Sequence, residues 1–464
     1  MALRRFLLAV RHLVSLGSTM RVYRGFAPTT CFDLDVQSAP DPCSISLGSD
    51  LSTFESECRG IKIGEIPAFK QKLREVPMDE GKIDCTLHVG MPKTGTSSIQ
   101  QSLFLGLRDP RFVYFSCGEV SGAQFLPVLV RASLAKPWFW NGRGGDSTFA
   151  SRMHRRYRSR FHQFLEQPRS QGKHLILSGE SCSGMPQADL VGLRQLLNDQ
   201  GYKVQVVVYL RPWKSWFESA YQQQIKLSTQ TGPSKIPATS LENLNRLDYR
   251  SQVEALDSSF GSEHVQICVF SRNQFPNGCV VEDFCQRVGI DFEPGAICRD
   301  NESIGLNAVK MLYCYKRFRQ QEYLLKPLSV WQHFQMTLAL REMPDTSFHF
   351  HSEYAAPILN DFASQSAWIE NRINASFRED FAAFDDRPCI RTLDDFLCFD
   401  EASVKWLARR TKLSVPKALR GEDAAKRIAE MIHRLRHQLP QWNQVSQSAG
   451  RSLRRSAVRW LYNR

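Results

Sequence analysis

The sequence lacks any apolar run long enough to cross a membrane. It also lacks a Cys-x-x-Cys pair among its 13 cysteines, so neither a zinc site nor a disulfide framework can be read from their spacing. Cysteines without such a framework are typical of proteins in reducing compartments. We therefore expect a cytoplasmic protein, in which the basic ends are the candidates for association with a membrane.

The chain has little net charge outside its two ends. Five arginines and no acidic residue lie in 1–32, and 15 Lys/Arg against three Asp/Glu lie in 403–464. Of the total charge of +13, the middle of the chain therefore carries about −4. This distribution argues against specific nucleic-acid binding, and it leaves basic ends that can contact anionic surfaces. The Arg-rich start fits a targeting segment, an amphipathic surface helix or an unselected leader.

Strand and helix signals alternate along the central part of the 464-residue chain. Apolar runs predict strands at 85–89, 111–115, 174–178, 203–210 and 265–270, with helices near 97–107, 151–167, 187–200, 214–228, 250–260 and 279–288. Nearly continuous apolar runs such as VQVVVYL suit strands that are covered on both faces of a parallel sheet. We predict an α/β fold with a P-loop-like parallel sheet flanked by helices, and a mostly helical C-terminal region.

Three regions are predicted along the chain. Residues 1–83 form an irregular N-terminal extension, partly disordered because of its Pro, Gly, Ser and Asp clusters. Residues 84–385 form the P-loop-like domain, and 386–464 form a basic helical C-terminal extension. Within the domain, the aromatic and Gly-rich segment 136–146 has the composition of a loop that faces an acceptor, or of a hydrophobic anchor.

The segment LHVGMPKTGTSSIQ contains a strand, a Gly/Pro loop and the start of a helix. Free backbone N–H groups at a helix N-terminus form an anion site together with the helix dipole. Gly95 lets the backbone approach a phosphate closely, and the hydroxyls of Thr94, Thr96 and Ser97 add donors. The pattern therefore predicts an anion-binding turn, while a plain Gly-rich turn of an α/β protein remains the alternative.

The loop departs from the nucleoside-triphosphate pattern GxxxxGK[ST] at one position. Gly90 and Gly95 keep the spacing, but Thr96 stands where the lysine belongs, and the lysine is at position 93. A triphosphate hydrolase needs that lysine on the terminal phosphates and a hydroxyl-held magnesium. The displaced Lys93 therefore counts against an ATP-dependent reaction.

A second anion-binding pattern follows the run VQVVVY. Arg211 comes at the end of this predicted strand, and Ser219 lies eight positions later on the helix that follows. An arginine makes charge-assisted contacts to phosphate, and a serine adds a neutral donor beside it. An arginine that caps a strand end, with a solvent-facing serine, is the alternative.

Together these motifs resemble the sulfotransferases that use 3′-phosphoadenosine-5′-phosphosulfate. The run PKTGTSS looks like their phosphosulfate loop, and the preceding HVGM is similar to bacterial members. The resemblance, which extends over about 84–385, implies that Pro92, Lys93, Thr94, Gly95, Thr96 and Ser97 hold the phosphosulfate. It also implies that Lys93 stabilises the oxygen that leaves, and that Arg211 and Ser219 hold the 3′-phosphate.

The base that accepts the acceptor's proton is Glu or His in this family. Glu180 follows the run HLILS, at the carboxyl edge of the predicted parallel sheet, where ligands bind. Burial near the donor would raise its pKa into a range suited to base catalysis. A glutamate that only fixes the SGESCSG turn is the alternative, and His88, which precedes the loop, is the rival base or a packed core residue.

The sequence thus predicts a transferase that moves a sulfuryl group from the nucleotide donor to a hydroxyl or amine, with a carbohydrate as the expected acceptor. The donor is a co-substrate, and we expect no metal to be required. Two alternatives stay open, namely a P-loop kinase that uses ATP and a catalytically inactive nucleotide- or glycan-binding protein of the same fold. The acceptor and the oligomeric state are not determined by these motifs.

Overall fold

A computed structural model describes most of the chain from Ile83 to Leu439, in segments separated by short gaps. The described residues are 83–117, 120–123, 125–134, 146–227, 247–299, 303–319, 330–359 and 362–439. The predicted extension up to residue 82, the Gly-rich segment 136–145 and the last part of the basic tail lie outside these residues.

The core of the fold is a five-stranded parallel sheet. Its strands are β1 (Cys85–Gly90), β2 (Phe112–Tyr114), β3 (His174–Ser178), β4 (Val204–Leu210) and β5 (Val265–Val269), in the order β2-β3-β1-β4-β5. Strand β1 lies at the centre, where Cys85 pairs with Leu175 of β3 and with Val204 of β4. Every residue of β1 is buried, as its apolar run predicts. The predicted P-loop-like α/β fold is confirmed.

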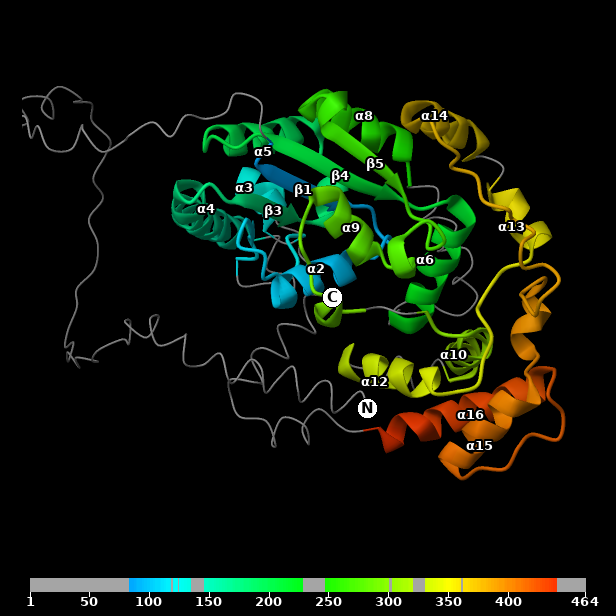
Figure 1. Cartoon of the computed structure of the whole chain (residues 1–464). Helices are drawn as coiled ribbons and strands as arrows, with labels where there is room; N and C mark the ends of the chain where they lie inside the picture. Colours follow the sequence, from blue (N-terminus) through cyan, green and yellow to red (C-terminus); the bar gives the residue numbers. More distant parts are fainter. Residues whose placement is uncertain are drawn as a thin grey trace, which may run out of the picture. The chain divides into compact units, whose positions relative to one another are not determined.

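Helices cover both faces of this sheet (Figure 1). On one face α2 (Thr96–Gly106) and α9 (Val280–Val288) pack against the strands through a cluster that includes Ile99, Val207 and Phe284. On the other face α4 (Ser147–Ser170), α5 (Gln187–Asn198) and α8 (Tyr249–Phe260) enclose a larger cluster with Leu87 and Val206. Successive residues of a strand point to opposite faces, so Leu87 and His88 enter different clusters.

The C-terminal part of the described chain is mostly helical, as predicted. Its helices are α10 (Leu306–Phe318), α12 (Val330–Arg341), α13 (Ser352–Leu359), α14 (Ala363–Ile373), α15 (Glu401–Thr411) and α16 (Glu422–Gln438). Helices α15 and α16 bury Leu407 and Ile428 in the same hydrophobic cluster as α10. The domain boundary at residue 385 stays a prediction, although this helical pair shares its core with the rest of the fold.

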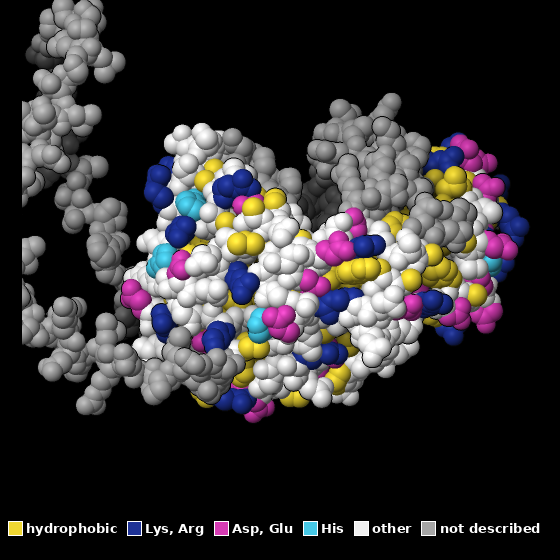
Figure 2. All heavy atoms as spheres, turned by 90° about the horizontal axis from the view of Figure 1, so that it is seen from above, with side chains coloured by type: hydrophobic (Ala, Val, Ile, Leu, Met, Phe, Trp, Pro, Cys, Tyr) yellow, Lys and Arg dark blue, Asp and Glu magenta, His cyan; other side chains and the backbone are white. Residues whose placement is uncertain are grey.

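The surface in Figure 2 carries acidic and basic side chains interspersed with one another over the described residues. This mixture agrees with the near-neutral middle of the sequence. Among the helices that the structure describes, none has the length and apolar character needed to cross a membrane. The ten cysteines within the described ranges are free thiols.

Candidate functional site

The loop between β1 and α2 has a left-handed backbone at three positions. Gly90 and Gly95 have φ values of 73° and 76°, and Lys93 has a φ of 73°. A left-handed conformation costs a residue with a Cβ roughly 1–2 kcal/mol, so Lys93 needs support from its surroundings. The predicted loop lysine is therefore the strained residue of this turn.

Three side chains hold the loop in this shape. Arg211, directly after β4, donates from Nη1 to the carbonyl oxygen of Lys93 at 2.9 Å. Trp216, on α6 (Trp213–Leu227), donates from Nε1 to the carbonyl of Pro92 at 3.1 Å. Inside the loop, Thr94 donates through Oγ1 to the carbonyl of Met91 at 2.6 Å. The backbone of Lys93 is thus fixed from outside by the residue that the sequence assigned to the second anion site.

The hydroxyls of the first helical turn differ in their surroundings. Thr96 is buried, and its Oγ1 lies 3.5 Å from the carbonyl of Met91. Ser97 is half-buried at the start of α2. A helix leaves its first backbone N–H groups without intrahelical partners, and the predicted anion site would use these donors at the start of α2.

Glu180 lies beside Gly90 at the start of the loop and is the first residue of the short 3-10 turn Glu180–Gly184 after β3. A Cβ added to Gly90 would stand 3.1 Å from the Cβ of Glu180 and 2.9 Å from Oγ1 of Thr96. Gly90 is therefore required for the close approach of Glu180 to the loop. The backbone N–H of Gly179 donates to the carbonyl of His88 at 2.9 Å and aligns this turn with β1.

Glu180 and Lys93 influence each other's charge. The Glu180 side chain is exposed to solvent, and partial desolvation by the surrounding protein raises the pKa of its carboxyl, against the opposing effect of Lys93. Desolvation lowers the pKa of Lys93 to about 8, while Glu180 acts to raise it and Arg211 to lower it further. The pair combines a carboxyl group with a raised pKa and an ammonium group with a pKa of about 8.

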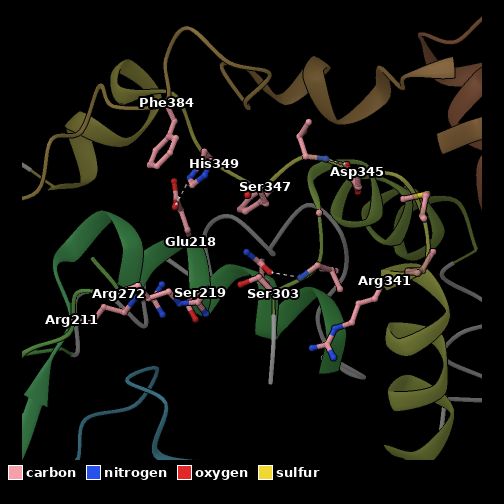
Figure 3. Close-up of a pocket in the computed structure, with 17 residues that line it drawn as sticks. Arg211, Glu218, Ser219, Arg272, Ser303, Arg341, Asp345, Ser347, His349 and Phe384 are labelled. Atoms are coloured by element: carbon pink, nitrogen blue, oxygen red, sulfur yellow. Dashed lines mark hydrogen bonds and ion pairs between the residues drawn. The ribbon is translucent and has the colours of Figure 1, made fainter. Parts of the chain in front are cut away.

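Arg211 and Ser219 share the wall of a cavity of about 480 Å³. The cavity lies between α6, the segment 303–305 and the segment 343–349, and Arg272 and Arg341 also line it (Figure 3). In Figure 3 Arg211, Arg272 and Ser219 lie on one side, and His349 and Phe384 form the opposite wall. The structure thus brings the two predicted phosphate ligands into one cavity and adds a second arginine beside them.

The two neighbouring arginines repel each other. Desolvation first, and then the charge of Arg272, lower the pKa of Arg211 to about 10. The guanidinium of Arg211 lies 5.1 Å from the ring centroid of Phe270, and its buried Nε has no hydrogen-bond partner among the described residues. An anion placed between Arg211 and Arg272 would relieve this repulsion and satisfy the remaining donor.

His88 does not line this cavity, and neither do Lys93 and Glu180. The His88 side chain is completely buried, with Nδ1 at 2.8 Å from Oγ of Ser178 and the ring centroid 5.2 Å from that of Phe284. Burial lowers the pKa of His88 to about 3, so the imidazole is neutral. Nε2 has no hydrogen-bond partner within the described ranges. These surroundings favour the packed core residue over the rival base.

Sequence reasoning missed Arg272, Glu218 and His349. Arg272 carried a usable signal, because it follows β5 at the same sheet edge at which Arg211 follows β4. Glu218 directly precedes Ser219 on α6, which was also visible in the sequence. His349 carried no such signal, since it reaches the cavity from a segment 131 positions away from its partner Glu218.

Comparison with known proteins gives few matches. No family model matches the chain. An uncharacterized protein of Archaeoglobus fulgidus is 28% identical over 117 residues, which are 25% of this chain and only 30% of the length of that protein. The crystal structure of a sulfotransferase from Alicyclobacillus acidocaldarius is 16% identical, covers 54% of this chain and 99% of its own, and superposes with a TM-score of 0.29. A superposition of that quality is too poor to assign a function.

Proposed function

We propose that this chain is a sulfotransferase that uses 3′-phosphoadenosine-5′-phosphosulfate as the sulfuryl donor. One observation carries the proposal: Arg211 bonds to the carbonyl of Lys93 and also lines the cavity with Ser219. The phosphosulfate loop and the 3′-phosphate pair that the sequence suggests are therefore adjacent. A donor with two separate phosphate groups on one ribose needs two such sites side by side.

The proposed step is a direct in-line displacement at sulfur. The acceptor hydroxyl or amine gives its proton to the Glu180 carboxylate as its oxygen or nitrogen bonds to sulfur. The bond between sulfur and the bridging oxygen breaks, and adenosine 3′,5′-bisphosphate leaves with the electron pair. Charge develops on that oxygen, where the Lys93 ammonium can stabilise it, an effect typically worth about 10²–10³ in rate.

Glu180 is the preferred base because of its contact with the loop. It packs against Gly90, interacts with Lys93 and has a raised pKa, whereas His88 is completely buried in the core beside Phe284. The acceptor proposed from the sequence is a carbohydrate. The segment 136–145, from which an acceptor contact was expected, lies outside the described residues.

A transfer assay with radiolabelled donor tests the proposal. The purified full-length chain is incubated with [³⁵S]-labelled donor and a panel of glycans, phenols and lipids, and label transferred to acceptor is counted. We expect inhibition by adenosine 3′,5′-bisphosphate and none by ATP with magnesium. Inhibition by ATP with magnesium and not by the bisphosphate would favour the kinase alternative. Calorimetry that detects no binding of the bisphosphate would reject the proposal.

Two variants separate the donor site from the base. Lys93→Ala should lower turnover by about 10²–10³-fold, whereas Lys426→Ala, which removes an exposed lysine paired with Glu422, should not. Glu180→Ala should lower turnover by about 10²–10⁴-fold while bisphosphate binding persists. Unchanged turnover in Glu180→Ala would show that another group is the base, and bisphosphate binding without any transfer would favour the inactive binding protein.

A further inference from the structure

The carboxylates that line the cavity are already engaged by backbone amides. Glu218 accepts from the backbone N–H of Phe350 at 3.0 Å. Asp345 accepts from the backbone N–H groups of Asn307 and Ala308 at 3.0 Å and 2.9 Å, at the start of α10. Hydrogen bonds of this kind stabilise the ionised carboxylate and use its lone pairs. Glu218 and Asp345 are thus held in place by the fold, and Arg211 and Arg272 are the cations beside Ser219 that can attract an anion.

His349 is held in one orientation on the wall opposite Arg211. Its Nδ1 lies 3.1 Å from Oε2 of Glu218, and its ring stacks on Phe384 with the centroids 3.8 Å apart and the planes inclined by 2°. Among the described residues, Nε2 of His349 has no hydrogen-bond partner, and the side chain is 17% exposed. A ring fixed on one face and at one nitrogen presents a defined second nitrogen to a ligand.

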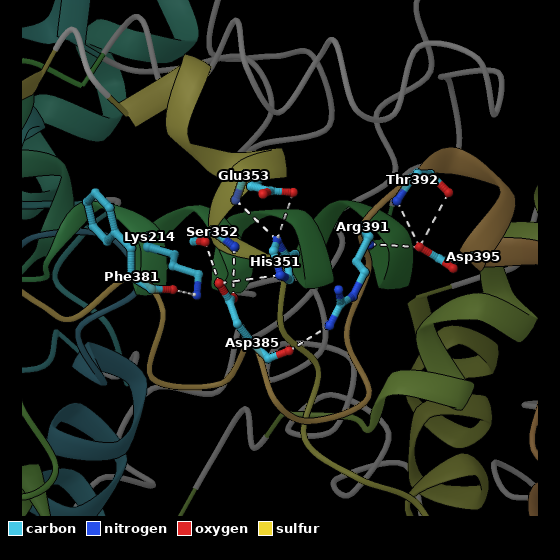
Figure 4. A network of polar contacts seen from close by, with 9 residues as sticks. All are labelled: Lys214, His351, Ser352, Glu353, Phe381, Asp385, Arg391, Thr392 and Asp395. Carbon is cyan, nitrogen blue, oxygen red and sulfur yellow. Dashed lines mark hydrogen bonds and ion pairs between the residues drawn. The ribbon is translucent and has the colours of Figure 1, made fainter.

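Polar contacts also hold the chain on either side of Phe384, at Phe381 and at Asp385 (Figure 4). Asp385 accepts from the backbone N–H and the hydroxyl of Ser352, and its Oδ2 lies 3.4 Å from Nε2 of His351. Lys214, on α6, donates to the carbonyl of Phe381. These contacts fix the segment on both sides of Phe384, so the stacked ring of His349 is positioned before any ligand binds.

The hydrogen bond to Glu218 determines which nitrogen of His349 carries the proton. A carboxylate can only accept, so Nδ1 must donate to it. The neutral ring then has a lone pair at Nε2, and the charged ring has a second N–H there. Only the charged ring can donate to an anion in the cavity.

The charges around His349 come from several elements. The ionisable groups that share the cavity or contact Phe384 are Glu218 and Lys214 of α6, Arg211, Arg272, Arg341, Asp345 and Arg387. A bound phosphate dianion and a protonated His349 attract each other, so that protonation of the ring and anion binding support each other.

We propose that His349 is a ligand-binding residue of this cavity, which donates from protonated Nε2 to a phosphate monoester. The inference rests on the proposed function, in which that monoester is the 3′-phosphate of the donor. Binding of the phosphate then takes up a proton at His349, and the site holds its ligand more tightly in weakly acidic than in alkaline solution.

Isothermal titration of the full-length chain with adenosine 3′,5′-bisphosphate tests this inference. Titrations at pH 6 and pH 8.5, each in two buffers of different ionisation enthalpy, give the affinity and the number of protons taken up. Because the phosphate itself titrates near pH 6, the informative quantity is the difference between the wild-type chain and His349→Gln. Inorganic phosphate in place of the nucleotide shows whether the phosphate group alone is recognised.

His349→Gln should bind the bisphosphate about 10-fold more weakly than the wild-type chain at pH 6 and about equally at pH 8.5. It should also take up to about one proton fewer on binding. His264→Gln, which changes an exposed histidine beside Glu263, should behave as the wild type. His349→Asn serves if His349→Gln does not fold. Equal affinity and equal proton uptake in the wild-type chain and the variant would overturn the role of His349. Bisphosphate binding in that experiment would still support the proposed donor site. No binding to the wild-type chain at either pH would overturn both.

Discussion

The guanidinium of Arg211 donates to the carbonyl oxygen of Lys93 at 2.9 Å, and Lys93 has a left-handed backbone there. One side chain therefore both stabilises the strained residue of the loop and lines the cavity that Ser219 shares. The geometry of the loop and the charge of the cavity are linked through this residue. Substitution of Arg211 should consequently weaken both halves of the proposed donor site, the loop and the cavity.

Arg211→Lys should impair the site although it keeps the positive charge. Lysine lacks the planar fork of donors, so it cannot hold the Lys93 carbonyl and face the cavity together. We expect bisphosphate affinity to fall by about 10–100-fold, the range for losing a charge-assisted contact. Calorimetry measures this, with Arg131→Lys as a control in an ion pair with Asp189 outside the cavity. Equal affinity in both variants would contradict the linking role of Arg211.

Gly90→Ala should lower the transfer activity far more than it lowers the stability of the fold. The substitution places a Cβ at φ 73°, 3.1 Å from the Cβ of Glu180, so the glutamate must move. Gly172→Ala is the matched control, because Gly172 has a φ of 62° and open space around it. Both variants should lose roughly 1–2 kcal/mol of stability through the backbone, measured by urea unfolding. Only Gly90→Ala should lose transfer activity. Equal losses of activity in the two variants would contradict a role of Gly90 in the site.

The pH dependence of turnover should be bell-shaped. Glu180 must be ionised to accept a proton, so the rate falls as the pH drops through its raised pKa. Lys93 must be protonated to stabilise the leaving oxygen, so the rate also falls as the pH rises through about 8. Lys93→Arg should remove the alkaline limb, since arginine stays charged there. Glu180→Gln should remove the acid limb from the remaining activity. Persistence of either limb in its variant would assign that limb to another group.

His88→Asn should retain transfer activity within about threefold, because the asparagine amide can replace Nδ1 in the bond to Ser178. It should also change the acid sensitivity of folding. The pKa of His88 is about 3 in the folded chain, so between roughly pH 6.5 and pH 3 only the unfolded chain binds the proton, and stability falls as the pH falls. Urea unfolding should show that the free energy of unfolding falls less between pH 7 and pH 5 in the variant than in the wild-type chain. A large loss of activity would instead support His88 as a base.

The two central strands could be predicted from the sequence because a strand that is covered on both faces is mostly apolar. The run VQVVVYL and the buried CTLHVG are consequences of that requirement, and they became β4 and β1 at the centre of the sheet. The order of the anion-binding patterns along the chain was equally visible, since Gly90, Gly95 and the start of α2 are local features. Their roles in binding stay predictions.

The orientation of side chains depended on the tertiary structure. The sequence predicted Glu180 as the base and left His88 as its rival. The pleat of β1 turns His88 into the cluster around Phe284, whereas Glu180 follows the end of β3 beside the loop. The packing of α9 over that face removes His88 from solvent.

The sequence by itself determined a parallel α/β fold and a glycine-containing turn before a helix, because periodicity and backbone conformation are encoded over a few residues. The tertiary structure alone decided that Arg211 fixes Lys93 and that His349 and Glu218 form a pair 131 positions apart. Contacts of this kind are made by segments that are remote in the chain. Their geometry is set by how the helices and the sheet pack, and no local pattern records it.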